Sequence, residues 1–218
     1  MQEAPVAKKV KKILEIHNDQ RIDNYFWMRL SDEQKEAEQP DQQTHDVLDY
    51  LHAENDYRKH VMKPTEKLQK TIYDEIIGRI KQDDSSVPIT VNGYTYYSRF
   101  KKGQNYPYYC REKAEDNTKE EVMLDVPTMA EGYAYYAIGG RSVSENNKIL
   151  AYAVDTVSRR EYTLYFKNLE TGEILSDKIE NTTGGITWAN DNQTVFYVKK
   201  DPQTLRAYQI FKHLLGTD

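Results

Sequence analysis

The chain has a single cysteine, Cys110, and only ten glycines and seven prolines among its 218 residues. One cysteine excludes a disulfide within the chain and a metal site built on several thiolates. No stretch approaches the roughly 20 apolar residues that a membrane-spanning helix needs, so we expect no membrane partner. The short basic N-terminal segment lacks the apolar core of a secretory signal. We therefore expect a cytoplasmic protein, or a periplasmic one if a leader has been removed.

The chain also has no excess of positive charge. The 30 Lys and Arg residues stand against 35 Asp and Glu residues, which gives a net charge of −5. A nucleic-acid partner normally requires a basic face, so this balance opposes such a partner. Tyrosine, in contrast, is abundant, with 18 residues. Because tyrosine favours half-buried strands, this number indicates a fold that is mainly β.

The first 80 residues differ from the rest and are predicted to be helical or irregular. Apolar residues at helical spacing predict one helix over residues 46–62 and a second over residues 65–80. Residues 21–29 form an aromatic segment that would be costly to leave exposed, and the polar segment 31–43 is predicted to be a loop. We interpret residues 1–80 as an N-terminal helical extension.

Residues 81–88, which are polar and end in proline, are the predicted hinge. After them the apolar pattern has a period of two, and Asn92-Gly93 is typical of a tight turn between strands. Residues 94–100, 106–112 and 121–126 are predicted to be three strands of one sheet.

A repeat of about 45 residues is the strongest internal signal. Gly139-Gly140 recurs as Gly184-Gly185, and Asn146-Asn147 recurs as Asp191-Asn192. A period of roughly 40 to 50 residues with several strands in each unit is typical of β-propeller blades. Residues 89–218 are thus predicted to form a partial propeller with two blades and most of a third. The third copy stops before its outer strand, so we expect the natural chain to continue.

The chain offers little that could act as a catalytic centre. A serine nucleophile often lies in G-x-S-x-G, and the nearest match, around Ser142, has serine in the final position. The repeat places Ser142 on the innermost strand of a blade, so we predict a structural role. The five histidines have no metal-binding spacing, and we expect no metal and no cofactor.

Arg159 and Arg160 are adjacent in a segment that joins two predicted strands. Paired guanidinium groups can bind a carboxylate through two parallel hydrogen bonds. The pair could contact substrate or an opposing domain, or it could form an internal salt bridge that fixes the loop. We name both arginines as candidate contact residues and leave these alternatives open.

Several segments together resemble the oligopeptidase B branch of the prolyl oligopeptidase family of serine peptidases. The resemblance extends in order over nearly the whole chain from about Lys11. The segments that carry it are residues 21–29, 50–55, 79–88, 92–99, 106–112, 125–132, 155–160, 188–191 and 201–206. The most specific are Asp155-Thr156-Val157-Ser158-Arg159-Arg160, Trp188-Ala189-Asn190-Asp191 and Asp201-Pro202-Gln203-Thr204-Leu205-Arg206.

The resemblance implies a serine oligopeptidase that cleaves short peptides after Lys or Arg. A seven-bladed propeller would control access to a C-terminal α/β-hydrolase domain, on which residues 1–80 would pack. The catalytic Ser, Asp and His of the family lie in that domain, and no residue of this chain matches their motifs. The chain alone is therefore expected to be inactive. The implied partners are short basic peptides and the hydrolase domain of the same protein.

A different class of function is also open. The chain could be a free-standing, non-catalytic binding module that uses its partial propeller as a scaffold and pairs its open edge with another chain. Further blades and a G-x-S-x-G sequence beyond residue 218 would favour the peptidase, whereas a stop codon there would favour the binding module.

Overall fold

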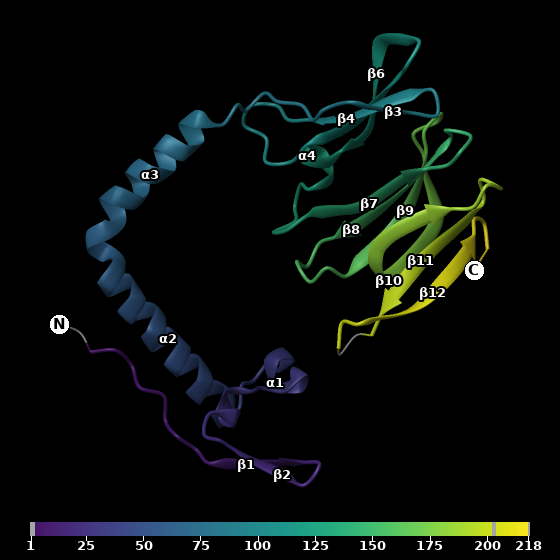
Figure 1. Ribbon diagram of the computed structural model, residues 1–218. Helices are drawn as coiled ribbons and strands as arrows, with labels where there is room; N and C mark the ends of the chain where they lie inside the picture. The colour runs from purple at the N-terminus through teal and green to yellow at the C-terminus, as the bar shows by residue number, and fades with distance from the viewer. Residues whose placement is uncertain (1–2, 202–203, 218) are drawn as a thin grey trace. The chain divides into compact units, whose positions relative to one another are not determined.

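The computed structural model describes residues 3–201 and 204–217 and contains two compact units, Met1–Ile80 and Lys81–Asp218 (Figure 1). The elements of the first unit, in chain order, are β1 (Lys12–Ile16), β2 (Asp19–Asp23), η1 (Phe26–Met28), α1 (Asp32–Glu36), α2 (Gln42–Met62), η2 (Lys63–Thr65) and α3 (Glu66–Arg79). No helix in the described parts of the chain combines the length and the apolarity that crossing a bilayer requires.

The predicted helices are present, but the first of them starts earlier than the apolar pattern indicated. The side chain of Asp41 accepts a hydrogen bond of 2.7 Å from the backbone N–H of Thr44, and this cap begins α2 at Gln42. The loop prediction for residues 31–43 is wrong, because α1 also lies there. Ser31 and Gln34 form a reciprocal capping box at its start.

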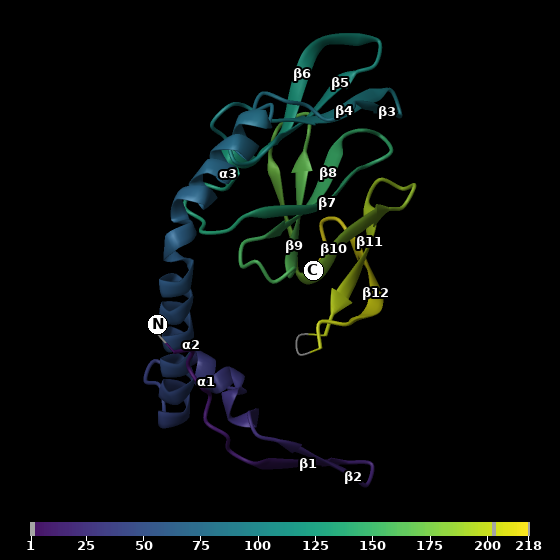
Figure 2. The same ribbon diagram turned by 60° about the vertical axis from the view of Figure 1, so that its left-hand side comes forward.

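The helices α2 and α3 are joined end to end through η2 and do not pack side by side (Figures 1 and 2). Neither helix can therefore cover the apolar face of the other. Leu68, Ile72 and Ile76 of α3 remain 59%, 47% and 54% exposed, and α3 contains no buried residue. The first unit thus has an apolar surface without a partner within the unit.

A β-hairpin, β1–β2, occupies part of the region that was predicted to be helical or irregular. Ile13 pairs with Ile22, and the turn uses His17 and Asn18 at positive φ. In the aromatic segment that follows, Trp27 donates a 2.9 Å hydrogen bond from Nε1 to the carbonyl of Lys8, and the Lys8 ammonium lies 5.0 Å from the centre of the indole ring. The residues that precede β1 therefore cover part of the aromatic segment.

The second unit contains two sheets. The elements are β3 (Ile89–Val91), β4 (Tyr94–Arg99), β5 (Tyr108–Lys113), β6 (Asp116–Asp125), α4 (Val126–Met129), β7 (Ala137–Val143), β8 (Ile149–Asp155), β9 (Tyr162–Asn168), β10 (Ile174–Trp188), β11 (Thr194–Lys200) and β12 (Ala207–Leu214). Strands β3 to β6 form an antiparallel sheet in sequence order, and β7 to β12 form a six-stranded sheet, also in sequence order. Figures 1 and 2 show β7 and β8 next to the first sheet, and β11 and β12 at the far end of the six-stranded sheet.

The first sheet contains the three predicted strands and one more, β3. Val91 pairs with Tyr94 across a two-residue turn, in which Asn92 and Gly93 both have positive φ. This is the backbone that a tight hairpin turn requires, and it confirms the turn predicted from Asn92-Gly93.

The later repeats are not separate sheets, because β10 serves two blades. Its first half pairs with β9 up to Thr182, and its second half pairs with β11 from Thr182 onward. The register shifts on both sides of Thr182, where Asn181 and Gly184 have positive φ. These kinks turn the outer strand of one blade into the inner strand of the next without a break in the strand.

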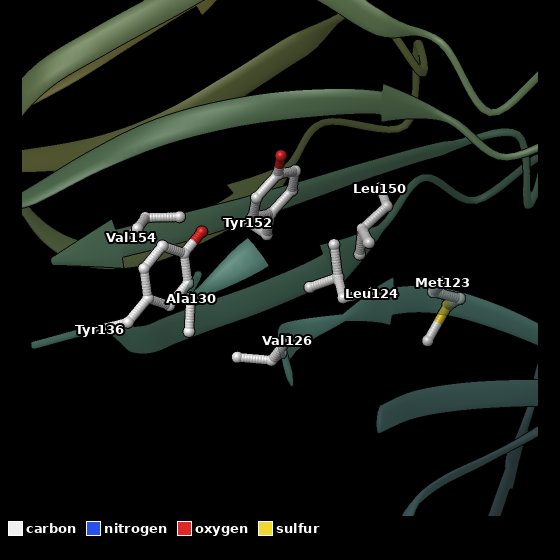
Figure 3. Packing of buried hydrophobic residues seen from close by; sticks show 8 residues of the cluster. All are labelled: Met123, Leu124, Val126, Ala130, Tyr136, Leu150, Tyr152 and Val154. Atoms are coloured by element: carbon white, nitrogen blue, oxygen red, sulfur yellow. The ribbon is translucent and has the colours of Figure 1, made fainter. Parts of the chain in front are cut away.

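Two apolar clusters hold the unit together. The first joins Met123 and Leu124 of β6 and Val126 of α4 to Leu150 and Tyr152 of β8, as Figure 3 shows. The second joins Leu164 and Phe166 of β9 to Ile179, Val195 and Tyr197 of the next strands. Each cluster lies where one blade meets the next.

The two Gly-Gly pairs of the repeat meet in space. A Cβ atom on Gly140 of β7 would overlap the carbonyl oxygen of Gly184 in β10. The repeated glycines therefore allow the first strands of neighbouring blades to approach each other closely.

Candidate functional site

The loop between β8 and β9, residues 156–161, carries the two candidate arginines. Asp155 ends β8 as a fully buried side chain. Its Oδ1 accepts hydrogen bonds from the backbone N–H groups of Val157 (2.8 Å) and Ser158 (3.0 Å), and its Oδ2 accepts one from Arg160 (2.7 Å). These three bonds hold Ser158 and Arg160 at positive φ. The shape of the loop is thus set by the carboxylate of Asp155.

Arg159 and Arg160 are both exposed. Within the described residues neither guanidinium forms an ion pair, so the internal salt bridge considered from sequence is not what fixes the loop. The carbonyl of Arg160 accepts a hydrogen bond from the Lys200 ammonium, which ties the loop to the end of β11. The role of the two side chains in contacting substrate or another domain stays a prediction.

Hydrogen bonds between repeated asparagines bring together the turns that follow the first strand of each blade. Asn92 donates to the carbonyl of Glu145, and Asn147 donates back to the carbonyl of Asn92 at 3.0 Å. The backbone N–H of Asn146 donates to Asn192 at 2.7 Å. The turns that follow the first strand of each blade therefore lie side by side at one end of the unit.

The loop of Arg159 and Arg160 lies at the opposite end, because it follows the second strand of its blade. The predicted hinge enters at that same end. There Ser86 donates to the carbonyl of Ser98 at 2.8 Å, and Asp83 accepts from the backbone N–H of Lys102 at 2.8 Å. The candidate arginines and the connection to the first unit thus share one end of the strands.

Arg111 joins the first blade to the second, and nothing in the sequence indicated this. The side chain is only 3% exposed. Its Nε donates to Glu121 at 2.7 Å, its Nη1 donates to the carbonyl of Asn147 at 2.8 Å, and its guanidinium lies 4.2 Å from the centre of the Tyr94 ring. All of these partners are structural, so Arg111 is a positioning residue and not a free binding group.

Arg99, Glu120 and Tyr97 form a second charged cluster in the first sheet. Arg99 donates to both carboxylate oxygens of Glu120, at 2.8 and 2.6 Å, and the Tyr97 hydroxyl donates to Glu120 at 2.8 Å. The Arg99 hydrogen bonds outweigh burial and lower the pKa of Glu120 to about 2. Burial, followed by the nearby Glu120 charge, raises the pKa of Cys110 to about 12, so this thiol is not activated as a nucleophile.

The remaining candidates are structural as well. Ser142 lies within β7, where its carbonyl accepts a 3.0 Å hydrogen bond from Nε1 of Trp188. His213 bonds to Asp177 at 2.7 Å, across the boundary between the second and third blades. Burial favours a raised pKa for Asp177, but the hydrogen bonds from His213 and the Gly216 N–H outweigh it and lower that pKa. The described residues contain no group of three side chains that could hold a metal ion.

Comparison with known proteins identifies this architecture. Residues 5–218 match the family model described as prolyl oligopeptidase, N-terminal beta-propeller domain. The chain belongs to this family. The match confirms the partial propeller and the family resemblance inferred from the sequence.

Two curated relatives are similar over nearly the whole chain. Dipeptidyl aminopeptidase BI of Pseudoxanthomonas mexicana is 41% identical over 227 aligned residues, which cover 97% of this chain and 30% of the relative. Protease 2 of Moraxella lacunata is 31% identical, with 98% of this chain and 30% of the relative covered. The chain therefore spans less than a third of the length of these family members.

Solved structures of the family have the same fold. Oligopeptidase B from Leishmania major aligns with a TM-score of 0.85 at 29% identity, over 99% of this chain and 31% of that one. Oligopeptidase B from Trypanosoma brucei, with covalently bound antipain in a closed form, aligns with a TM-score of 0.83 at 27% identity, over 99% and 31%. The family alignment thus includes the helical unit as well as the strands.

Proposed function

We propose that this chain is the N-terminal and propeller portion of a serine oligopeptidase that hydrolyses short peptides after Lys or Arg. The observation that carries the proposal is the family match over residues 5–218 together with relatives about three times as long. In this proposal the propeller controls which peptides reach an α/β-hydrolase domain that lies in the remaining part of the protein.

The catalytic steps belong to that remaining part. A serine would attack the scissile carbonyl, a histidine would move the proton, an aspartate would orient the histidine, and an oxyanion hole would stabilise the intermediate. The described residues contribute access and support. The Trypanosoma brucei relative, solved in a closed form with a covalently bound inhibitor, is consistent with such an arrangement.

The exposed apolar face of the helical unit supports a docking role toward the hydrolase domain. Leu68, Ile72, Ile76 and Ile80 repeat at four-residue intervals, and each is about half exposed. Covering this stripe would stabilise the assembled protein by roughly 25 cal/mol for each Å² of apolar surface removed from water.

Arg159 and Arg160 are proposed to contact a carboxylate of the hydrolase domain or of the substrate. Their guanidinium groups are unpaired among the described residues, while their loop is held rigidly by Asp155. A rigid loop with free donors loses little conformational entropy when it binds. We also propose a cytoplasmic location, or a periplasmic one if a leader is removed, which cell fractionation would test.

The test uses the 218-residue chain and the full-length protein that contains it. The full-length protein is expected to hydrolyse Arg- and Lys-ester substrates and to react stoichiometrically with a serine-directed fluorophosphonate. The chain alone is expected to do neither. Stoichiometric labelling of the chain alone, or no labelling of the full-length protein, would contradict the proposal. In the second case the free-standing binding module would be the better description.

A second specificity is favoured by the relative named dipeptidyl aminopeptidase BI, at 41% identity. Such an enzyme would require a free amino terminus on its substrate. Paired peptides that differ only in N-terminal acetylation separate the two specificities. The oligopeptidase cleaves both, whereas the aminopeptidase cleaves only the unblocked peptide.

A further inference from the structure

A pocket of about 640 Å³ lies within the second unit, between the first sheet and the strands β7 and β8. Binding sites for small ligands typically have volumes of about 300–1,000 Å³. Met123 and Leu150, at one end of the apolar cluster in Figure 3, line this pocket. Its other aliphatic lining residues are Val87, Ile89, Val91 and Val143.

Arg141, an exposed residue of β7, places a positive charge in the lining of this pocket, which also contains polar side chains such as Ser142 and Asn147. Its guanidinium lies 3.7 Å from the centre of the Tyr109 ring, which also lines the pocket. Among the described residues, no carboxylate pairs with Arg141 and no hydrogen bond is formed by its guanidinium. Stacking on a ring leaves the N–H groups at the edge of the guanidinium plane available to a ligand.

The other two arginines of the same region are both neutralised. Arg99 donates two hydrogen bonds to Glu120, and Arg111 donates one to Glu121. Arg141 differs from them because an aromatic ring, and not a carboxylate, holds it in place. The stack fixes the orientation of the side chain while its charge remains unpaired, which is the preorganisation that a carboxylate site needs.

Glu145 is the acidic residue in the lining of the pocket, and it belongs to the turn after β7. The negative charge of Glu145 disfavours binding of phosphate and other dianions in the pocket, whereas a ligand with a single carboxylate can still bind at Arg141. The apolar part of the lining favours a ligand whose carboxylate is attached to an apolar group. A peptide with an apolar C-terminal residue has both properties.

We propose that Arg141 and Tyr109 form a binding site for the C-terminal carboxylate of a short peptide, in the wall between the first two blades. This inference rests on the proposed function, since the propeller of an oligopeptidase is exposed to peptide substrates and products. The site binds without catalysis and is separate from the loop of Arg159 and Arg160.

The test compares two probes that differ only at the carboxyl group, N-acetyl-alanyl-leucine and its C-terminal amide. Each probe is titrated into the isotope-labelled 218-residue chain, and the NMR signals of the Arg side-chain Nε–H groups are followed. The signal that disappears in Arg141→Lys is assigned to Arg141. The acid is expected to shift the Arg141 signal saturably with Kd at or below about 1 mM, and the amide to bind at least about ten-fold more weakly.

Variants then identify the residue responsible. Arg141→Gln should weaken binding of the acid at least about ten-fold, and Arg141→Lys should weaken it less, because lysine keeps the charge but loses the planar pair of donors. Lys148→Gln is the matched control, since it removes one positive charge from the exposed turn beside β7. It should leave binding unchanged.

Three results would overturn the inference: equal binding of the acid and the amide, equal loss in Arg141→Gln and Lys148→Gln, or no saturable shift up to about 10 mM probe. The first and third are measured on the unsubstituted chain, where Arg141→Lys serves only to assign the signal, so poor folding of Arg141→Gln cannot obscure them. Because binding is measured without hydrolysis, its failure leaves the proposed peptidase function standing. Failure of the full-length protein to react with fluorophosphonate would in turn leave a measured peptide site intact.

Discussion

Helix α3 of the first unit buries none of its side chains, whereas strand β8 of the second unit buries six of its seven. Both elements carry several large apolar residues. The difference lies in what surrounds them. The two long helices follow one another end to end, while β8 is paired with a strand on each side and packs against the first sheet.

The comparison teaches that the two units have different sources of stability. The second unit has its own two apolar clusters and can gain its stability internally. The first unit leaves its stripe in water, so its stabilisation must come largely from a surface outside the unit. Each of the following predictions tests this division, beginning with the largest expected effect.

A substitution in the core of the second unit should reduce stability far more than a substitution on the exposed stripe of the first unit. Phe166 is fully buried in the second cluster. Phe166→Ala is expected to lower the free energy of unfolding by about 3–5 kcal/mol. Ile76→Ala, on the exposed stripe, should change the stability of the 218-residue chain by less than about 0.5 kcal/mol. Chemical denaturation followed by circular dichroism measures both. A loss of more than about 2 kcal/mol in Ile76→Ala would show that the stripe is already covered and would break the comparison.

The repeated glycines provide a matched pair within the second unit. Gly140→Ala should destabilise the unit by about 1–3 kcal/mol, because its new Cβ overlaps the backbone of Gly184. Gly185 occupies the same place in the next repeat, but its nearest neighbour would be 3.8 Å away. Gly185→Ala should therefore be nearly neutral in thermal melts. Equal shifts of Tm in the two variants would contradict the close approach of the strands.

Lowering the pH should destabilise the second unit, because Glu120 becomes protonated. Its pKa is about 2 in the folded protein, against an ordinary value of 4.5, chiefly because of the Arg99 hydrogen bonds. A lowered folded pKa stabilises the folded state above pH 4.5, and this stabilisation is lost as the pH falls from about 4.5 to 2. Glu120→Gln should flatten the pH dependence of denaturation midpoints in that interval, while Asp74→Asn, from an exposed helical pair, should not. An unchanged slope in Glu120→Gln would count against the cluster.

The smallest effect is expected in the first unit. Gly78 lies in α3 with no atom within 4 Å of an added Cβ. Gly78→Ala should stabilise the helix by up to about 1 kcal/mol, since alanine has the higher helix propensity. Helical circular dichroism during thermal melting measures it. Destabilisation by this substitution would mean that something packs against this face of α3.

The regular features of the fold were predictable from the sequence because they depend on local patterns. The tight turn at Asn92-Gly93 needs two residues that accept positive φ. The 45-residue repeat in the sequence corresponds to the repeated blades. The predicted end of the first helix at residue 62 is where α2 ends. The start of α2 was missed because the Asp41 cap precedes the apolar stripe, and α1 was missed because its capping box contains no apolar residue.

The contacts between blades could not be predicted in this way. Arg111 and Asn147 are 36 residues apart in sequence, and nothing local distinguishes Arg111 from the unpaired Arg141. The roles of Asp155 and Asp177 also depend on which backbone N–H groups the fold brings to them. Arg159 and Arg160 were found because they are adjacent, which says nothing about their partners.

The unbroken course of β10 has a mechanical consequence. Strand β10 is hydrogen-bonded to β9 along its first half and to β11 along its second, so pulling the third blade from the second would have to shear backbone hydrogen bonds. The first sheet is joined to β7 through α4 and residues 130–136, with no ladder between β6 and β7. Under load we therefore expect this seam to yield before the ladders of β10, and the pocket of Arg141 lies along it.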